Sequence, residues 1–469
     1  KNPLAVELAK ISLWLVSHAE GMPLTFLDHR LVLGDSLTGP FFEQLLTYPG
    51  SGKPIDNLFH QGLRKQFSQS LTIALQSVHE LEAGVGISIS EMEAKRAAKK
   101  KLDQALNPFQ LVSAAWGGGI ALCKEKKKTE KNNYLTETDE SYAICDDRAY
   151  EELVSAVAKQ TELSSVVDAY PALAKMIDRG KGGAYSGLAG SEENSVLTIR
   201  ATPAISYDIV FPEVFFPTGE LSSGSGFDVV LGNPPWDTLQ PLAKEFFAAF
   251  DFRILDAPTR RERSRIESDL NADRKIKSAF HAYTDEIEST KRIINRLYTH
   301  VGRQADNRPS GAVTDFWQVF AERGCNLLSQ TGRIGWVLPS AFHANQSATG
   351  IRRLYLENMI LFCCYSFENR RKLFEIHSSF KFALLTAARG GPTAGFPCAF
   401  YLHDDEWLFS DRGERQLEYT LEFVQRTGGS YFSFLELQSR LDAEICQTAY
   451  SKNTLLSEYF QHTNIHCGE

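Results

Sequence analysis

Cys-x-x-Cys pairs and long apolar runs are both missing from this sequence. The chain of 469 residues has eight cysteines, and none of them forms a Cys-x-x-Cys pair. A zinc site or a disulfide framework is therefore not expected, no metal is predicted, and a reducing cytoplasm is the predicted compartment. No apolar run approaches the roughly 20 residues that a membrane-spanning helix needs. The chain opens with an amphipathic helical pattern and not with a signal peptide.

An excess of positive charge is missing too. The formal net charge is −8 at pH 7, which by itself argues against a nucleic-acid partner. Net charge is a poor guide in a long chain, however, because nucleic acids bind to local basic patches. The length allows about two to four domains, and 43% hydrophobic with 23% charged residues is ordinary for a globular protein. A DNA partner therefore stays open.

The rest of the chain is organised around residues 227–236, which read FDVVLGNPPW. The first half is a compact apolar run closed by a glycine, as is typical of a buried parallel strand. Two consecutive prolines then fix their own φ angles and push Asn233 out of helical conformations. Asn233, the Pro234 carbonyl and Trp236 are therefore expected at the carboxyl end of a strand, where open α/β sheets bind ligands. Asn-Pro-Pro alone is also a common turn; attached to a strand and followed by an aromatic residue, it suits a planar exocyclic amine.

Asn233-Pro234-Pro235-Trp236 resembles the (Asn/Asp)-Pro-Pro-(aromatic) motif of amino-group methyltransferases that depend on S-adenosyl-L-methionine. Residues 211–215, FPEVF, resemble the large adenine-specific enzymes of bacterial restriction-modification and phage-defence systems, the Eco57I-like group. The resemblance implies DNA methylation at adenine N6 by a site-specific methyltransferase. It also implies S-adenosyl-L-methionine as the cofactor, double-stranded DNA as the partner and other defence-system subunits as further partners.

The same resemblance assigns catalytic roles to Asn233, Pro234, Pro235 and Trp236. The Asn233 side-chain oxygen and the Pro234 carbonyl would accept the two protons of the amine, which frees the nitrogen lone pair for attack on the methyl group. Asn233 is expected to face the cofactor as well. Trp236 would stack on a base that has been extruded from the duplex, because the amine cannot be reached inside the base stack.

The amino end resembles a cofactor segment of the same family. Asn2 is a good helix N-cap, Pro3 suits the first helical position, and apolar residues follow at helical spacing up to Leu15. The family has an acid-x-Asn-Pro segment here, in which Lys1 would be the x and the acid would hold the cofactor ribose. The acid and the glycine-rich loop are expected before Lys1. The chain as given is therefore expected to bind S-adenosyl-L-methionine weakly and to expose a flat sheet edge.

Residues 31–37 are predicted to form a short strand followed by a turn with Asp35 and Ser36. The segment resembles the family motif whose carboxylate accepts a hydrogen bond from the adenine amino group of the cofactor. Lys1, Asn2, Asp35, Ser36 and Asn233 are thus the expected cofactor-binding residues. The alternative is that Asp35 only caps the following turn, which is a frequent role for aspartate.

The predicted catalytic core comprises residues 1–60 and 205–400, interrupted by two helical insertions, 61–204 and 237–311. The first insertion carries two lysine-rich runs, around Lys99 and Lys127, which are solvated faces or DNA-backbone contacts. Its glycine-rich stretches, 117–119 and 180–190, do not lie between a strand and a helix, so a nucleotide-binding loop is not predicted. Residues 401–469 are expected to begin a region that leads to a target-recognition domain.

An α/β pattern returns after the second insertion. Residues 315–329 and 351–357 read as helices, and 334–339, 359–367 and 380–386 read as strands. This alternation predicts an α/β fold with a doubly wound, mostly parallel sheet, as in a Rossmann-like methyltransferase core. The loop over 368–381 falls where the family places its second base-stacking aromatic residue. Phe374 is the predicted residue, with Phe367 and Phe380 as competitors, and His377 is interpreted as structural.

Three other interpretations remain open at this point. Methylation of cytosine N4 or of protein glutamine uses nearly the same tetrapeptide. A non-catalytic DNA-binding or assembly subunit would keep the fold as a scaffold only. Larger restriction enzymes join a nuclease to such a core, but no nuclease motif is visible in this sequence.

Overall fold

The structure is a computed structural model that describes residues 3–16, 30–83, 88–123, 146–180, 203–221, 225–303, 314–410 and 412–454. Two compact units make up the chain. The helical unit comprises Lys1–Ser223 and Gln240–Leu297, and the sheet unit comprises Gly224–Leu239 and Tyr298–Glu469. Each unit is described separately below. No helix in the described part of the chain combines the length and the apolar character needed to cross a membrane.

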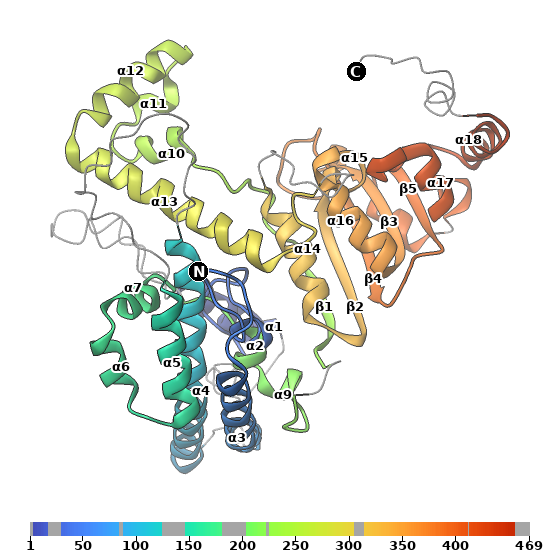
Figure 1. The fold of residues 1–469 in the computed structure, drawn as a ribbon. Helices are drawn as coiled ribbons and strands as arrows, with labels where there is room; N and C mark the ends of the chain where they lie inside the picture. The colour runs from blue at the N-terminus through green and yellow to red at the C-terminus, as the bar shows by residue number, and fades with distance from the viewer. Residues whose placement is uncertain are drawn as a thin grey trace. The chain divides into compact units, whose positions relative to one another are not determined.

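Among the described residues of the helical unit, the regular elements are helices (Figure 1). They are α1 (Pro3–Val16), α2 (Phe42–Leu45), α3 (Asn57–Glu82), α4 (Ile89–Leu122), α5 (Asp147–Lys159), α6 (Leu163–Ala169), α7 (Pro171–Gly180), α8 (Tyr207–Val210), α9 (Pro212–Phe215), α10 (Ala243–Ala248), α11 (Arg253–Asp256), α12 (Arg260–Asn271) and α13 (Arg274–Leu297). Within the first predicted insertion, 61–204, the described regular structure is helical. The predicted short strand over 31–37 is absent, because only an isolated bridge joins Asp35 to Ala204.

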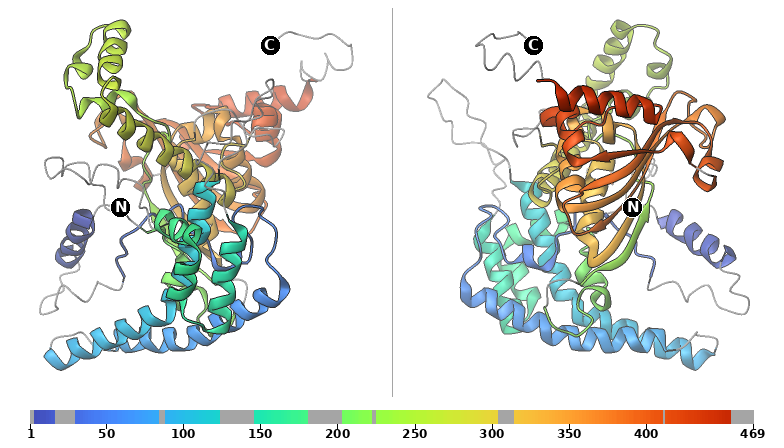
Figure 2. Two further views of the ribbon diagram at one scale, coloured as in Figure 1. Left: turned by 60° about the vertical axis from the view of Figure 1, so that its left-hand side comes forward. Right: turned by 90° about the vertical axis from the view of Figure 1, so that its right-hand side faces the viewer.

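The core of the helical unit lies between α3 and α4, two long helices that run side by side (Figure 2). Phe42 stacks on Phe67, and Phe67 meets Phe109 edge-on, with ring centroids 4.1 and 4.8 Å apart. Small residues set the spacing of α4 and α7, since a Cβ on Gly118 would lie 1.7 Å from the Met176 carbonyl oxygen. The glycines at 117–119 therefore include one that close helix packing requires.

The sheet unit has one six-stranded mixed sheet with the strand order β1-β2-β4-β3-β5-β6. The strands are β1 (Phe227–Gly232), β2 (Leu328–Pro339), β3 (Met359–Glu368), β4 (Lys381–Arg389), β5 (Gly395–Leu402) and β6 (Leu417–Thr420). The β1–β2 and β3–β5 pairs are parallel, whereas β2–β4, β3–β4 and β5–β6 are antiparallel. The predicted α/β class is confirmed. The doubly wound, mostly parallel arrangement is not, because β4 and β6 run against their neighbours.

Helices of the sheet unit lie along one face of this sheet (Figure 1). They are α14 (Phe316–Leu327), α15 (Ala341–Ala344), α16 (Thr349–Arg353), α17 (Leu421–Gly428) and α18 (Arg440–Lys452). Their apolar side chains meet alternate residues of β2 and β4, among them Trp336 and Leu385. The Trp336 indole N–H donates to the Tyr355 hydroxyl at 2.8 Å, which satisfies a buried polar group. The helices predicted over 315–329 and 351–357 correspond to α14 and to the end of α16 with the following π-turn, Leu354–Asn358.

The other face of the sheet is buried only near one end. Tyr365, Phe367 and Phe382 form a second buried cluster there. Toward the edge strand β1, Val229 and Leu231 are 63% and 82% exposed. Edge strands with exposed apolar side chains tend to associate. β1 is parallel to its neighbour, as predicted, but it is an exposed edge strand and not the buried strand that its apolar run predicted.

Candidate functional site

The candidate site lies at the end of the sheet that is formed by the carboxyl ends of four strands. β1, β2, β3 and β5 run in the same direction, so their carboxyl ends share one edge. Asn233 follows β1, Ser340 follows β2, Asn369 follows β3 and His403 follows β5. β4 begins at the same edge with Lys381. The predicted Asn-Pro-Pro-Trp motif, after β1, and the predicted base-stacking loop, between β3 and β4, thus lie at the same end of one sheet.

The Asn-Pro-Pro-Trp turn is held by the start of α14. Asn233 and Pro235 are exposed, Pro234 is buried and Trp236 is half-buried. Directly after the turn, the Phe316 N–H donates to the Asp237 carbonyl at 2.9 Å, and the Leu239 N–H donates to the Thr314 carbonyl at 2.7 Å. These backbone bonds fix the chain on the far side of the prolines. The Asn233 amide is therefore presented to solvent from a turn that is held at both ends.

Trp236 is packed and not free. Its ring contacts the apolar core under the helices and also the cluster around Phe367 and Phe382. Its indole nitrogen is buried and finds no hydrogen-bond acceptor among the described residues. A buried N–H without an acceptor is unfavourable, and such groups in a native structure call for an explanation. Here the group lies beside the turn that is predicted to grip a ligand.

Asn369 holds the β3–β4 loop in one shape. It is fully buried, and its side-chain amide donates to the carbonyls of Phe374 and Ile376 at 2.9 Å each. Its side-chain oxygen accepts from the Phe374 N–H at 3.0 Å. Lys372 turns the chain with a φ of 54°, in the left-handed region. The Asn369 side chain thus provides hydrogen bonds within a loop that is not paired in the sheet. It bonds both the N–H and the carbonyl of Phe374.

The three candidate aromatic residues of the loop have different surroundings. Phe367 is buried and stacks on Phe382, so it belongs to the core. Phe374 is half-buried and meets Phe382 edge-on, with centroids 4.9 Å apart. Phe380 is 53% exposed, just before β4. Phe374 and Trp236 pack against the same cluster, so the structure brings together the two residues that the sequence paired.

The His377 ring contacts Ser379, two residues further along the same turn. Its ring nitrogen Nδ1 accepts from the Ser379 N–H at 3.2 Å and lies 2.7 Å from the Ser379 hydroxyl oxygen. The ring is exposed and shapes the chain that leads into β4. This geometry agrees with the structural interpretation made from the sequence.

Charged side chains close the base of the loop, and sequence reasoning missed them. Glu368, at the end of β3, pairs with Arg370 and lies 3.8 Å from the Lys381 ammonium. Lys381 also pairs with Glu436 at 3.0 Å. Burial alone would raise the pKa of Glu436, but the hydrogen bonds from Lys381 and Tyr401 outweigh it, so the pKa is lowered. The only sequence signal for this cluster was a charged residue at the end of an apolar strand.

The candidate cofactor residues Asp35 and Ser36 belong to the helical unit. Asp35 is buried, and its carboxylate accepts from the Leu37 N–H at 2.9 Å, so it does cap the following turn. Its main chain bonds to Pro203 and Ile205. A cavity of about 450 Å³ adjoins this segment. Its walls come from the segments before Asp35 and after Pro203 and from α4, and they are mainly apolar: Val32, Leu33, Leu111, Ala114, Ile205 and Val210. Lys1 and Asn2 lie outside the described residues.

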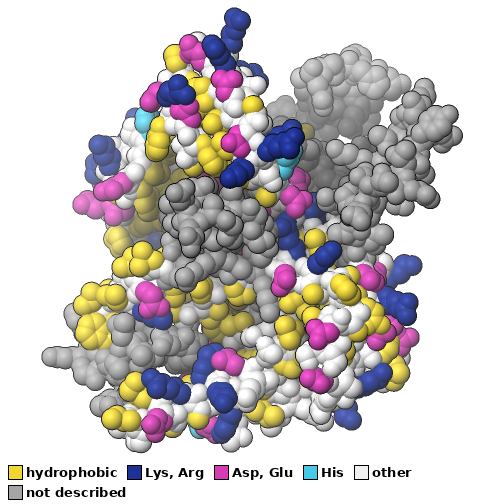
Figure 3. Space-filling view, turned by 90° about the vertical axis from the view of Figure 1, so that its left-hand side faces the viewer, with side chains coloured by type: hydrophobic (Ala, Val, Ile, Leu, Met, Phe, Trp, Pro, Cys, Tyr) yellow, Lys and Arg dark blue, Asp and Glu magenta, His cyan; other side chains and the backbone are white. Residues whose placement is uncertain are grey.

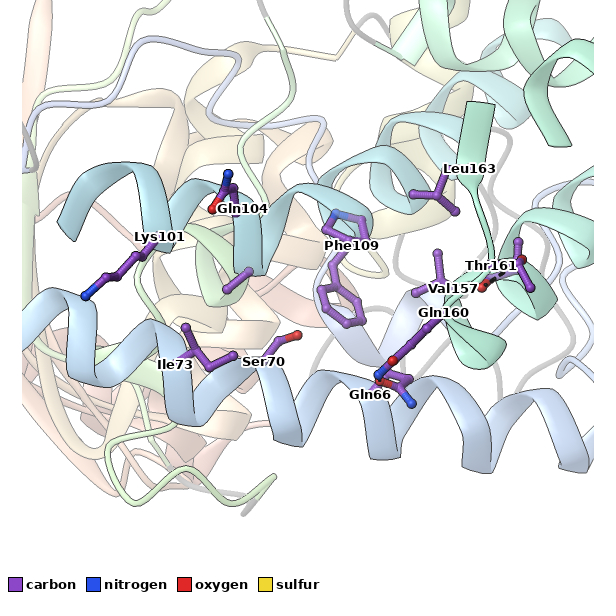
Figure 4. A pocket seen from close by; sticks show the side chains of 13 residues that line it. Gln66, Ser70, Ile73, Lys101, Gln104, Phe109, Val157, Gln160, Thr161 and Leu163 are labelled. Atoms are coloured by element: carbon purple, nitrogen blue, oxygen red, sulfur yellow. Dashed lines mark hydrogen bonds between the residues drawn. The ribbon is translucent and has the colours of Figure 1, made fainter. Parts of the chain in front are cut away.

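A second cavity, of about 410 Å³, opens between α3, α4 and α5 (Figure 4). Its floor is apolar, with Phe109 and Val157, and amide side chains line its rim. Gln160 donates to Gln66 at 2.5 Å on one side, and Lys101 lies at the other end. No motif in the sequence pointed to this cavity. It is a feature of helix packing around Pro108, which lies inside α4.

No protein-family model matches this chain, and no curated protein matches it significantly. Solved structures give weak likenesses. A chain from a type I restriction-modification system, studied for complex assembly and conformational transition, is 14% identical, with coverage of 88% of this chain and 95% of that one and a TM-score of 0.24. A modification subunit of a putative type I restriction enzyme from Vibrio vulnificus YJ016 is 10% identical, covering 76% and 93%, with a TM-score of 0.22. The M protein of the type I restriction enzyme EcoKI is 10% identical, covering 85% and 97%, with a TM-score of 0.23. These TM-scores are too low to carry an argument about function.

Proposed function

We propose that this protein transfers a methyl group from S-adenosyl-L-methionine to the N6 amino group of adenine in DNA, within a bacterial restriction-modification or phage-defence system. One observation carries the proposal. The Asn233-Pro234-Pro235-Trp236 turn and the Phe374 loop lie at the same edge of one sheet, with Trp236 and Phe374 packed on the same apolar cluster. An amide oxygen, a carbonyl oxygen and two aromatic rings are the groups that an extruded adenine needs.

The chemistry of the amine follows from the turn. The Asn233 side-chain oxygen and the Pro234 carbonyl accept the two amino protons, so the nitrogen lone pair leaves conjugation with the ring. Positive charge develops on this nitrogen as it attacks, and oxygens that are already in place stabilise it without reorganisation. Because the backbone bonds after Trp236 hold the turn, these oxygens are fixed before the base arrives. No strong base is required, since the nitrogen loses its proton after the transfer.

The helical unit supplies residues that fit the cofactor. The largely apolar cavity beside Asp35 suits the flat adenine ring, and the carboxylate suits its amino group. Asp35 already caps one turn, yet a carboxylate accepts more than one hydrogen bond, so the two roles are compatible. Ser36 is half-buried in the same turn. When bound, S-adenosyl-L-methionine supplies an activated methyl group on a sulfonium.

The test is transfer of labelled methyl groups to DNA, followed by digestion to nucleosides and mass spectrometry. The expected product is N6-methyladenine in duplex DNA. Label in N4-methylcytosine or in protein glutamine would support the other interpretations of the tetrapeptide. Absence of label in every product, with a folded protein that still binds DNA, would favour the non-catalytic subunit.

A further inference from the structure

The helices α10 to α13 form a small arm of the helical unit with its own apolar core. Phe247 and Ile254 are buried in it, and Ile266, Ile276 and Phe280 pack around them. We call residues 251–277 the arm tip. It contains eight cationic residues and six carboxylates. The numbers of cationic and acidic residues are nearly equal, but the two kinds of side chain differ in how often they form ion pairs and hydrogen bonds.

Most cations of the arm tip are exposed and make no ion pair with any described residue. Six of them share this state: Arg260, Arg261, Arg265, Arg274, Lys275 and Lys277. Figure 3 shows cationic side chains at the top of the view, with carboxylates and apolar side chains between them. The other two cations differ: Arg253 pairs with Asp251 at 2.6 Å, and Arg263 is half-buried.

The carboxylates of the arm tip form ion pairs or hydrogen bonds more often than its cations do. Asp251 binds Arg253, and Asp269 adds to the charge that raises the pKa of Arg253. Asp273 accepts from the Lys275 N–H at 2.7 Å and so caps the first turn of α13. Pairing of Arg253 with Asp251 removes one charge of each sign, so the arm tip keeps the excess of two positive charges that its sequence gives, and six of its cations are exposed without an ion pair to any described residue.

Several cations elsewhere in the helical unit bind other groups of that unit. At the other end of α13, Arg292 donates to the Ala121 carbonyl at 2.5 Å, and Arg296 donates to the Pro49 carbonyl at 2.9 Å. On the two long helices, Arg64 pairs with Glu43, and Lys99 with Asp103. A single helix, α13, thus binds protein with its carboxyl-terminal cations and leaves its amino-terminal cations to solvent.

We infer that the arm tip binds the phosphate backbone of duplex DNA. This inference rests on the proposed function only in taking DNA as the partner. Arg261 and Arg265 lie one turn apart on α12, about 6 Å along its axis, and each DNA strand carries one charge per roughly 3.4 Å of duplex. Guanidinium groups bond phosphate oxygens in pairs, and such contacts give affinity without reading sequence.

The experiment compares the full chain with the triple variant Arg260→Gln, Arg261→Gln, Arg265→Gln in fluorescence-anisotropy titrations against a 30-base-pair duplex over a series of salt concentrations. Each lost phosphate contact lowers the slope of log K against log salt by about 0.9, so a fall of about 2 to 3 is expected. At roughly 0.1 M salt the affinity should fall about tenfold or more, equally for unrelated sequences. Arg253→Gln is the matched control and should leave slope and affinity unchanged, because its charge is already paired.

Two results would overturn the inference. One is a triple variant that melts like the wild type and keeps its salt slope and affinity. The other is tighter binding of the wild type to poly-glutamate than to DNA, with the triple variant losing only that binding, since it would make the partner an acidic protein. A second variant, Arg274→Gln, Lys275→Gln, Lys277→Gln, independently tests whether the cations at the amino end of α13 bind DNA. If the wild type transfers no methyl group but the arm variants still lose DNA affinity, the proposed function fails and this inference stands.

Discussion

The sheet unit and the helical unit use buried polar groups differently. In the sheet unit, single side chains hold whole loops: Glu322 accepts from the N–H groups of residues 299–301, and Arg352 donates to the carbonyls of Phe342, Asn345 and Tyr431. In the helical unit, buried polar bonds join helices in pairs, as between Ser113 and Ser206 at 2.6 Å. Loops fixed in this way can present chemical groups at defined positions, whereas a helix bundle presents cavities and charged surfaces. We therefore expect chemistry to depend on the sheet unit, and ligand and backbone binding to depend on the helical unit.

The largest expected effect is on catalysis by the sheet unit. Asn233→Ala removes one of the two oxygens that accept the amino protons and should lower the rate of methyl transfer by about two to three orders of magnitude. Stability should not change, because the side chain is exposed. Single-turnover transfer of labelled methyl groups measures the effect. Asn358→Ala, an exposed asparagine before the amino end of β3, is the control. A near wild-type rate in Asn233→Ala would remove the turn from the mechanism.

The next prediction is that the stability of the sheet unit depends more strongly on pH than the stability of the helical unit does. Burial lowers the pKa of His343 from 6.5 to about 4, so the folded sheet unit keeps this ring neutral while the unfolded chain protonates it. The depressed pKa means that its contribution is complete above pH 6.5 and is lost as the pH falls through 4, about 3 kcal/mol in all. Among the described residues of the helical unit no histidine is buried.

Calorimetric melts at a series of pH values provide the measurement. The transition of the sheet unit should move down between pH 6.5 and 4 more than that of the helical unit. His343→Phe keeps a ring against Phe434 but cannot titrate, so its melting temperature should depend less on pH in this range. An equal pH dependence in the variant and the wild type would show that other groups control the acid stability.

A smaller effect tests whether Asn369 acts through Phe374. Base–aromatic stacking is worth roughly 1–3 kcal/mol, so Phe374→Ala should weaken binding of DNA with an unpaired adenine more than binding of ordinary duplex. Asn369→Ala frees the loop and should produce the same selective loss. Because both changes remove one placed ring, the double variant should bind no worse than the poorer single variant. Additive losses would mean that Asn369 does not work through Phe374, and a silent Phe374→Ala with a sensitive Phe380→Ala would move the stacking role to Phe380.

The smallest effect concerns the helical unit. Asp35→Asn keeps an oxygen to accept from the Leu37 N–H but removes the negative charge. If the carboxylate also binds the cofactor, calorimetric titration with S-adenosyl-L-methionine should show affinity reduced by about tenfold, with the melting temperature preserved. Asp35→Ala should lose both. Unchanged affinity in Asp35→Asn would leave Asp35 with the capping role alone.

Local patterns in the sequence predicted the elements near the candidate site well. The strand over 334–339 is part of β2, and those over 359–367 and 380–386 are β3 and β4 within two residues at their amino ends. These segments are apolar runs closed by glycine, proline or charge, and such signals are local. The strand expected over 31–37 failed, because only Asp35 in it forms a bridge, with Ala204, and no strand pairs with the segment. A strand exists only when a neighbour pairs with it along its length.

The sequence by itself determined the residue types and the local shape of the Asn-Pro-Pro-Trp turn, because proline restricts the backbone of its neighbours wherever it stands. It also placed an aromatic residue in the β3–β4 loop. Only the tertiary structure decided that Phe367 belongs to the core, that Asn369 bonds the main chain of Phe374 and that Trp236 and Phe374 share one cluster. It alone decided which cations of α13 stay free. Burial and pairing depend on residues far apart in the chain, and no local pattern records them.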